Sequence, residues 1–201
     1  MNSRLVPVVL AAGASSRMGR PKPLLDLRGR TALDRILDVC ALAGVAPAVV
    51  VLGSDAEAVE AGCDLGRAIV ARHGEWARGM TSSLQAGLRV LPAFAEGVFV
   101  WPVDLPLVPA QVVRELAIRF ALARQNQRLP ILIPRGSRRG HPVLFDRGYL
   151  ADLLALPSDR PPRDVIDRHA GAVEEVRAGE EVVRDLDTPA DYAAALEADP
   201  R

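Results

Sequence analysis

The chain has 201 residues, of which 49% are hydrophobic and 4% aromatic, enough to bury one core built mainly from alanine, valine and leucine. Acidic and basic residues balance at 25 each, so charge alone would not gather nucleic acid or anionic lipid, and a phosphate ligand needs local groups. No apolar run is long enough to span a membrane, and residues 1–13 lead into a glycine-rich loop instead of a signal-peptide cleavage site. We therefore expect a cytoplasmic protein without nucleic-acid or membrane partners.

The first two thirds of the sequence alternate apolar runs with stretches of helical period, which predicts a parallel sheet covered by helices. Strands and helices are expected to alternate in the order 5–11, 31–44, 46–53, 55–60, 67–72, 81–91, 97–106 and 109–124. Thr31 is the expected N-cap of the first helix, and Thr81 or Ser82 that of the third. Asp104 ends the fourth strand, where open parallel sheets bind their ligands.

Shorter elements follow in the last third of the chain. The pattern predicts a strand at 129–134, a loop at 135–145, helices near 148–156 and 162–169, a β-hairpin through 172–186 and a closing helix after Pro189. Together these elements predict an α/β fold. We expect a Rossmann-like three-layer sandwich, with a mostly parallel sheet and helices on both of its faces.

The glycine-rich loop after the first strand, "AAGASSRMGRPK", combines free backbone N–H groups with Arg17, Arg20 and Lys22. This composition is typical of an anion cradle, although a turn with solvated arginines would share it. The spacing fits neither a Walker A loop nor the GxGxxG of a dinucleotide site. Lys22 stands out because it is the only lysine among 25 lysine and arginine residues.

A resemblance to a known family is carried by residues 10–33, "LAAGASSRMGRPKPLLDLRGRTAL". The segment is similar to the signature LAAGxSxRMGxxKxLLxxxGxxxL of the MobA-like NTP transferases, which include the molybdenum cofactor guanylyl- and cytidylyltransferases. The similarity continues through "RGMTSSLQAGL", "VDLPLVPAQVV", "RGHPVLF" and "DLDTPADY". It implies a fold of the nucleotide-diphospho-sugar transferase type in a single domain, 1–201, with a nucleotide-binding part at 1–125 and an acceptor-binding, closing part at 126–201.

The resemblance implies transfer of a nucleotidyl group from an NTP to a phosphorylated acceptor, with release of pyrophosphate. Such catalysis consists mainly of in-line positioning and charge neutralisation. Lys22 suits the α-phosphate as a flexible point charge, and Arg17 suits the β- and γ-phosphates as a planar fork. The implied nucleotide-binding residues are Leu10, Ala11, Ala12, Gly13, Ala14, Ser15, Ser16, Arg17, Lys22, Thr81, Ser82 and Ser83.

Asp104 and Asp187 are the expected Mg²⁺ ligands, because this ion prefers one or two carboxylates together with phosphates and waters. Lys22, Arg17 and Asp104 form the expected catalytic set. Each aspartate also has a plainer interpretation. An aspartate at a strand end often forms a turn, and Asp187 before Thr-Pro could cap the last helix.

"LAAG" resembles the cytidylyl branch of the family, so CTP is the expected nucleotide and GTP the alternative; the Ala12 methyl group would favour a small pyrimidine. "GHPVLF" resembles the loop on the acceptor side, which makes Gly140, His141 and Pro142 candidates for binding molybdopterin. For His141, an ordering role within its own loop is equally open. Trp76 could stack on a flat ring. The segment 157–171 departs from the family pattern, which leaves the acceptor open.

Three functions follow from these observations. The first is a Mg²⁺-dependent cytidylyltransferase that acts on molybdopterin and passes its product to a molybdoenzyme. The second keeps the chemistry but uses another phosphorylated metabolite or sugar as acceptor. The third is a non-catalytic protein that binds and delivers a cofactor. Lys22, Arg17 and Asp104 argue against the third, because a carrier needs no lone lysine beside a metal site.

Overall fold

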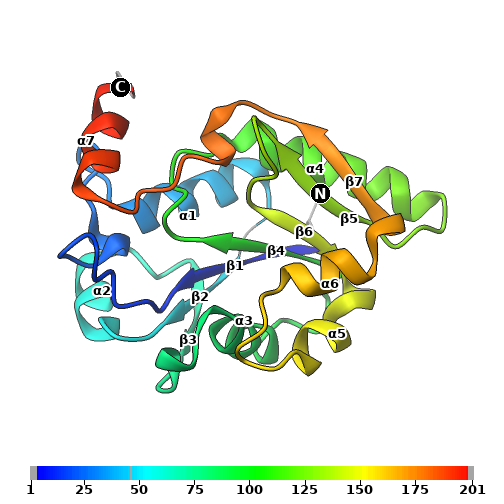
Figure 1. Ribbon diagram of the computed structural model, residues 1–201, viewed down its shortest axis with the longest axis horizontal. Helices are drawn as coiled ribbons and strands as arrows, with labels where there is room; N and C mark the ends of the chain where they lie inside the picture. The colour runs from blue at the N-terminus through cyan, green and yellow to red at the C-terminus, as the bar shows by residue number, and fades with distance from the viewer. Residues whose placement is uncertain (1–3, 46, 199–201) are drawn as a thin grey trace.

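The computed structural model describes residues 4–45 and 47–198. Within these residues seven strands form one sheet in the order β3-β2-β1-β4-β6-β5-β7 (Figure 1). Neighbouring strands are parallel except around β6, which runs antiparallel to β4 and β5. The strands are β1 (Leu5–Ala11), β2 (Ala48–Leu52), β3 (Ala68–Arg72), β4 (Gly97–Pro102), β5 (Ile131–Arg135), β6 (Val143–Asp146) and β7 (Val173–Arg177).

Helices cover both faces of the sheet, as Figure 1 shows for α1 and α4 on one side and α3, α5 and α6 on the other. Residues of β1 alternate between two buried clusters: Val9 packs with α1 and α4, and Val8 packs with α3 and α5. The predicted three-layer α/β sandwich is therefore confirmed. The helices are α1 (Ala32–Ala43), α2 (Ala56–Gly62), α3 (Met80–Arg89), α4 (Ala110–Gln125), α5 (Leu150–Ala155), α6 (Arg163–Arg168) and α7 (Pro189–Ala198).

The ends of α1 follow the expected capping chemistry. Thr31 Oγ1 accepts a hydrogen bond from Asp34 N at 3.0 Å, and Gly44 ends the helix at a φ of 74°. The next predicted strand, 46–53, is β2; its residue Ala46 lies outside the described residues. Among the residues that are described, no helix has the length and apolar character needed to cross a membrane.

The predicted cap of α3 is wrong. The N-cap is Gly79, whose φ of 108° is a conformation that glycine adopts without strain, and no side chain caps the helix. The hydroxyls of Thr81 and Ser82 bind elsewhere, because the helix begins one residue earlier than expected. Thr81 Oγ1 donates to Arg160 O at 2.5 Å, and Ser82 Oγ donates to Gly79 O at 2.8 Å.

Two predictions in the last third of the chain are also wrong. The expected loop 135–145 contains the start of β6, which inserts between β4 and β5 and is buried along its whole length. The expected hairpin at 172–186 is the single strand β7, which pairs in parallel with β5. The second half of the expected hairpin forms a 3-10 helix, Glu180–Val182, instead of a strand, because the Val182 side chain is fully buried in the core.

Candidate active site

A cavity of about 370 Å³ lies at the carboxyl ends of β1 and β4, where open parallel sheets place their ligands. The predicted nucleotide-binding residues that line it are Leu10, Ala12, Gly13, Ser15, Ser16, Arg17, Lys22 and Ser83. Asp104 and Trp76 also line it. Gly79 and Met80 are further parts of the wall that were not predicted, because no local pattern indicates that the turn before α3 reaches the strand ends.

The remaining predicted nucleotide residues do not line this cavity. Ala11 is buried in the core against α1 and α4, and Ala14 lies exposed on the loop. Thr81 and Ser82 are buried and use their hydroxyls within the protein. Ser82 Oγ also lies 3.0 Å from Nε2 of His73. The hydroxyls of Thr81 and Ser82 therefore do not contribute to the cavity wall.

Three segments that are distant in the sequence meet around Lys22. Its Nζ lies 3.1 Å from Asp104 Oδ2 and 2.5 Å from Asp187 Oδ1. Arg17 Nη1 lies 2.9 Å from the other oxygen of Asp187. The Lys22 side chain is only 13% exposed, so the two carboxylates provide most of the charge that replaces its water.

The charges of this group stabilise one another. Partial burial opposes the charged form of Lys22, but hydrogen bonds and charges from Asp187 and Asp104 outweigh it and raise the pKa of the ammonium. The hydrogen bond from Lys22 lowers the pKa of Asp187, and Arg17 contributes in the same direction. Lys22 and Asp187 are therefore both ionised at neutral pH.

The glycine-rich loop is held from within and from α7. Ser15, at a φ of 51°, accepts a hydrogen bond from Lys22 N through Oγ at 2.9 Å and from Met18 N through its carbonyl at 3.0 Å. Met18 and Leu25 pack in a small buried cluster with Leu186, which precedes Asp187. The loop that carries Lys22 and the segment that carries Asp187 therefore share one apolar anchor.

Asp187 does not cap α7. The carboxylate of Asp191 accepts hydrogen bonds from Asp187 N at 3.2 Å and from Thr188 N at 2.7 Å, and Thr188 Oγ1 lies 3.3 Å from Asp191 N. Because Asp191 and Thr188 satisfy this helix end, the Asp187 carboxylate is directed to Lys22 and Arg17. The backbone also ties the two aspartates together, since Leu186 N donates to Asp104 O at 2.8 Å.

The pair of aspartates fits a divalent cation that is also bound by substrate. Their oxygens converge on one cation, the Lys22 ammonium, so the position already favours positive charge. Within the described ranges no three side chains of His, Cys, Asp or Glu form a metal cluster. Two carboxylates completed by phosphates and waters are the coordination that Mg²⁺ prefers.

A second cavity of about 450 Å³ adjoins the first, and Met80 lines both. Gly140 and His141 line it as predicted acceptor residues, whereas Pro142 is not part of its wall. Its floor is apolar and its rim is rich in arginine. Three of the arginines lie in the sequence run 135–139, but the pattern does not place them over apolar residues of three different strands. The floor includes Val100, Ile133, Val143 and Phe145, and the rim includes Arg135, Arg138, Arg139 and Arg163.

His141 has a structural role that the sequence left open. Its backbone N–H donates to Val182 O at 2.9 Å, and its Nδ1 lies 3.4 Å from Val100 O. Burial lowers the pKa of the imidazole, so the ring is neutral at pH 7. Gly140 packs just as closely, because a Cβ at this position would lie 2.3 Å from Val182 O.

Residues 7–173 match the family model of the MobA-like NTP transferase domain. The chain belongs to this family. It is a nucleotidyltransferase related to the molybdenum cofactor guanylyl- and cytidylyltransferases.

Curated relatives of this MobA-like chain carry different names. The "Nicotine blue oxidoreductase" of Paenarthrobacter nicotinovorans is 35% identical over 70% of this chain and 70% of its own length. The "Molybdenum cofactor guanylyltransferase" of Rhodopseudomonas palustris is 31% identical over 68% of this chain and 63% of its own. The "Molybdenum cofactor cytidylyltransferase" of Escherichia coli is 25% identical over 94% of both chains.

Among solved structures, Rv0371C of Mycobacterium tuberculosis in complex with manganese superposes with a TM-score of 0.80 at 29% sequence identity. The match covers 98% of this chain and 100% of that chain. It extends beyond residue 173, where the family match ends, so β7 and α7 have counterparts in that structure.

Proposed function

We propose that the chain transfers a nucleotidyl group from an NTP, with CTP preferred, to the terminal phosphate of molybdopterin and releases pyrophosphate. The observation that carries this proposal is the convergence of Lys22, Arg17 and two aspartates at one cavity, next to a second cavity with an apolar floor and a cationic rim. We extend it to the whole chain as one domain, in which 1–125 binds the nucleotide and 126–201 binds the acceptor.

In the reaction, an oxygen of the acceptor phosphate forms a bond to the α-phosphorus of the NTP, and the bond from that phosphorus to the β-phosphate oxygen breaks. The electron pair leaves with pyrophosphate. Lys22 neutralises the charge that grows on the α-phosphate, and Arg17 that on the departing pyrophosphate. Both cations are held by Asp187, so each must exchange this carboxylate for phosphate when the nucleotide binds.

Asp104 and Asp187 would hold Mg²⁺, which when bound supplies further charge neutralisation on the phosphates. Lys22, now paired with both carboxylates, would supply its ammonium to the α-phosphate of the bound nucleotide, a role for which a flexible lysine side chain is well suited. The manganese complex of the related solved structure agrees with a divalent cation in this family.

The second cavity, here called the acceptor cavity, suits a flat, phosphorylated acceptor. Its floor offers apolar surface to a ring system. Glu175 binds Arg135 and Arg139 at 2.8 and 2.7 Å, so these two guanidiniums are partly neutralised. Arg138 lies 3.9 Å from Asp185 and Arg163 lies 3.6 Å from Asp167, in pairs that are long and exposed. Arg138 Nη2 also donates to Val183 O at 3.0 Å, a bond that leaves its charge without a close carboxylate. Arg138 and Arg163 are therefore the better partners for an acceptor phosphate.

The preference for CTP rests on Ala12, which lines the first cavity, here called the nucleotide cavity. Its position is rigid: a Cβ on Gly53 would lie 2.3 Å from Ala12 O and 2.7 Å from Trp76 Cβ, so these three residues pack without slack. Because this side of the cavity has no space to move outward, it favours the smaller pyrimidine base over a purine. A cytoplasmic location and delivery of the product to a molybdoenzyme stay predictions from the sequence.

Product analysis tests this proposal. The protein is incubated with molybdopterin, Mg²⁺ and either CTP or GTP, and the product is identified by mass spectrometry. We expect the cytidylyl ester of molybdopterin as the main product. A guanylyl product would keep the reaction and overturn the preference for CTP. Because one relative is named an oxidoreductase, a parallel assay follows NADPH oxidation; oxidation without any pyrophosphate release would overturn the proposal.

A further inference from the structure

We infer that Thr81 and Gln85 of α3 are positioning residues that fix the wall of the acceptor cavity relative to the nucleotide cavity. The inference rests on the proposed function. Neither side chain lines either cavity, and both are buried, with 2% and 8% exposure. Their hydrogen bonds leave α3 and reach the segment 153–160, which lies far along the chain and packs beside it through α5 (Figure 1).

Gln85 holds the end of α5. Its Nε2 lies 3.1 Å from the carbonyls of Leu153 and Leu154 and 2.8 Å from that of Leu156. The last carbonyls of a helix have no partner within the helix, so a buried amide that supplies donors there fixes where the chain leaves. Gln85 thereby sets the point at which the segment 156–163 begins.

Thr81 holds the same segment four residues later. Its Oγ1 donates to Arg160 O at 2.5 Å. Two prolines follow at once, Pro161 and Pro162, and both line the acceptor cavity together with Arg163. Because proline rings fix φ, the chain from Arg160 to Arg163 has little freedom to compensate for a shift at Arg160. The hydroxyl of Thr81 therefore determines the position of the Arg163 backbone.

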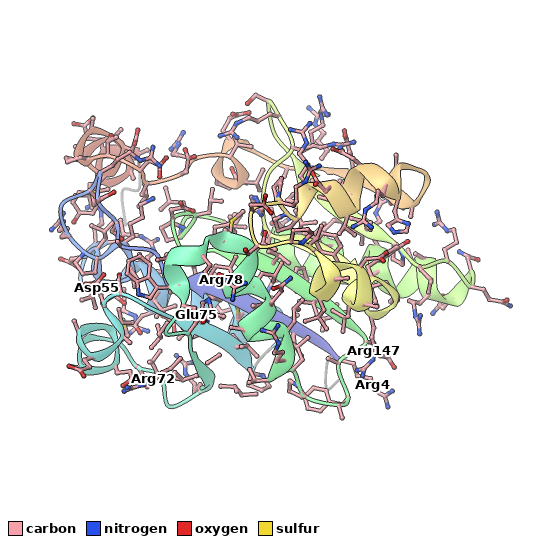
Figure 2. The ribbon with its side chains drawn as sticks, turned by 60° about the horizontal axis from the view of Figure 1, so that its bottom comes forward. Arg4, Asp55, Arg72, Glu75, Arg78 and Arg147 are labelled. Carbon is pink, nitrogen blue, oxygen red and sulfur yellow. The ribbon has the colours of Figure 1, made fainter. Side chains whose placement is uncertain are left out.

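The first turn of α3 links this bridge to the nucleotide. Gly79, Met80 and Ser83 line the nucleotide cavity, and Met80 lines the acceptor cavity as well. The segment before α3 is braced by an ion pair of 2.7 Å between Arg78 and Glu75, which lie side by side in Figure 2. A nucleotide that contacts this turn thus contacts the helix that carries Thr81 and Gln85. This matters because in-line transfer is sensitive to a misplacement of about 1 Å between the two substrates.

Kinetics of matched variants test the inference. Thr81→Val keeps the shape but removes the donor, whereas Thr81→Ser keeps the donor. We expect Thr81→Val to raise the KM for molybdopterin at least tenfold, with the Kd for CTP changed less than twofold. Thr81→Ser should stay within twofold of the original protein in both. Gln85→Met should resemble Thr81→Val, and Gln111→Met on the exposed start of α4 should change nothing.

Two kinetic outcomes would overturn the inference: an unchanged KM for molybdopterin in Thr81→Val, or a parallel loss of CTP binding, which would indicate a general loss of structure. Amide hydrogen exchange supplies a readout that needs no acceptor. CTP with Mg²⁺ should slow exchange in 156–163 of the original protein, and Thr81→Val should abolish this effect. Equal slowing in both proteins would also overturn it. Absence of any pyrophosphate release by the original protein would instead contradict the proposed function.

Discussion

At the scale of single residues, Lys22 is the side chain on which the proposed transfer reaction depends most. It is the only lysine of the chain, and its ammonium lies between Asp104 and Asp187 at 3.1 and 2.5 Å. A guanidinium is larger and planar, so it would not fit this position and then follow the α-phosphate during transfer. Position, flexibility and charge are all required of this one side chain.

Lys22→Arg should therefore lower kcat about 10²- to 10³-fold, the loss typical when one transition-state donor is removed. CTP affinity should change much less, because a positive charge remains; stopped-flow transfer rates and calorimetric titration of CTP separate the two. Arg4→Lys is the control, since Arg4 is 65% exposed at the amino end of β1 (Figure 2) and pairs with Glu96. A normal kcat in Lys22→Arg would show that charge alone suffices.

His141 gives a prediction about pH. Burial holds the folded-state pKa of this imidazole below its usual 6.5. Between the lowered value and 6.5 the unfolded chain binds more protons than the folded protein, so the free energy of unfolding falls as the pH decreases through 6.5. His141→Gln should make urea stability less dependent on pH between 7 and 5. His73, whose pKa burial also lowers, is present in both proteins and cancels. An unchanged pH dependence would contradict the burial of the ring.

The residues of the candidate site were predictable to different degrees. Lys22, Arg17, Asp104 and Asp187 follow from motifs whose residue types state their chemistry, and the structure brings the four together. The partner of Thr81 was not predictable, because Arg160 O comes from a loop 79 positions away and a hydroxyl before a helix is equally suited to capping.

At the scale of secondary structure, β6 is a strand that local sequence patterns do not predict, unlike the parallel strands beside it. The parallel strands β1, β2 and β4 are continuous apolar runs, which is why they were predicted. β6 has four residues after a loop of glycine and arginine, and it becomes a strand because β4 and β5 offer pairing edges on both sides. Such pairing is a tertiary effect that no short sequence window contains.

The entry to β6 depends on the absence of a side chain at Gly140. A Cβ there would lie 2.3 Å from Val182 O, so Gly140→Ala should destabilise the protein by about 2 to 3 kcal/mol through overpacking. Gly74→Ala is the matched control, because nothing lies within 4 Å of its added Cβ. Urea unfolding of the two variants measures the difference. Equal stability would show that the Val182 segment moves freely.

At the scale of the whole molecule, two adjoining cavities of about 370 and 450 Å³ lie at the carboxyl ends of β1 and β4 and beside β4, β5 and β6. The nucleotide cavity is built from loops after β1 and β4, and the acceptor cavity from β5, β6 and the segment before α6. α3 lies between them through Met80, and α7 anchors both the glycine-rich loop and Asp187. In the proposed function this arrangement would place a nucleotide and an acceptor side by side, which two-substrate transfer requires.

Pyrophosphate release, measured with and without molybdopterin, tests whether the chain transfers a nucleotidyl group to this acceptor. The original protein with CTP and Mg²⁺ should release pyrophosphate in proportion to added molybdopterin, and Asp104→Asn should reduce this at least about 100-fold by removing one of the two proposed metal ligands. Glu57→Gln, on the exposed side of α2 and in the wall of neither cavity, is the control and should release pyrophosphate normally. A rate of pyrophosphate release that does not depend on molybdopterin, or that is unchanged in Asp104→Asn, would contradict transfer to molybdopterin at this site.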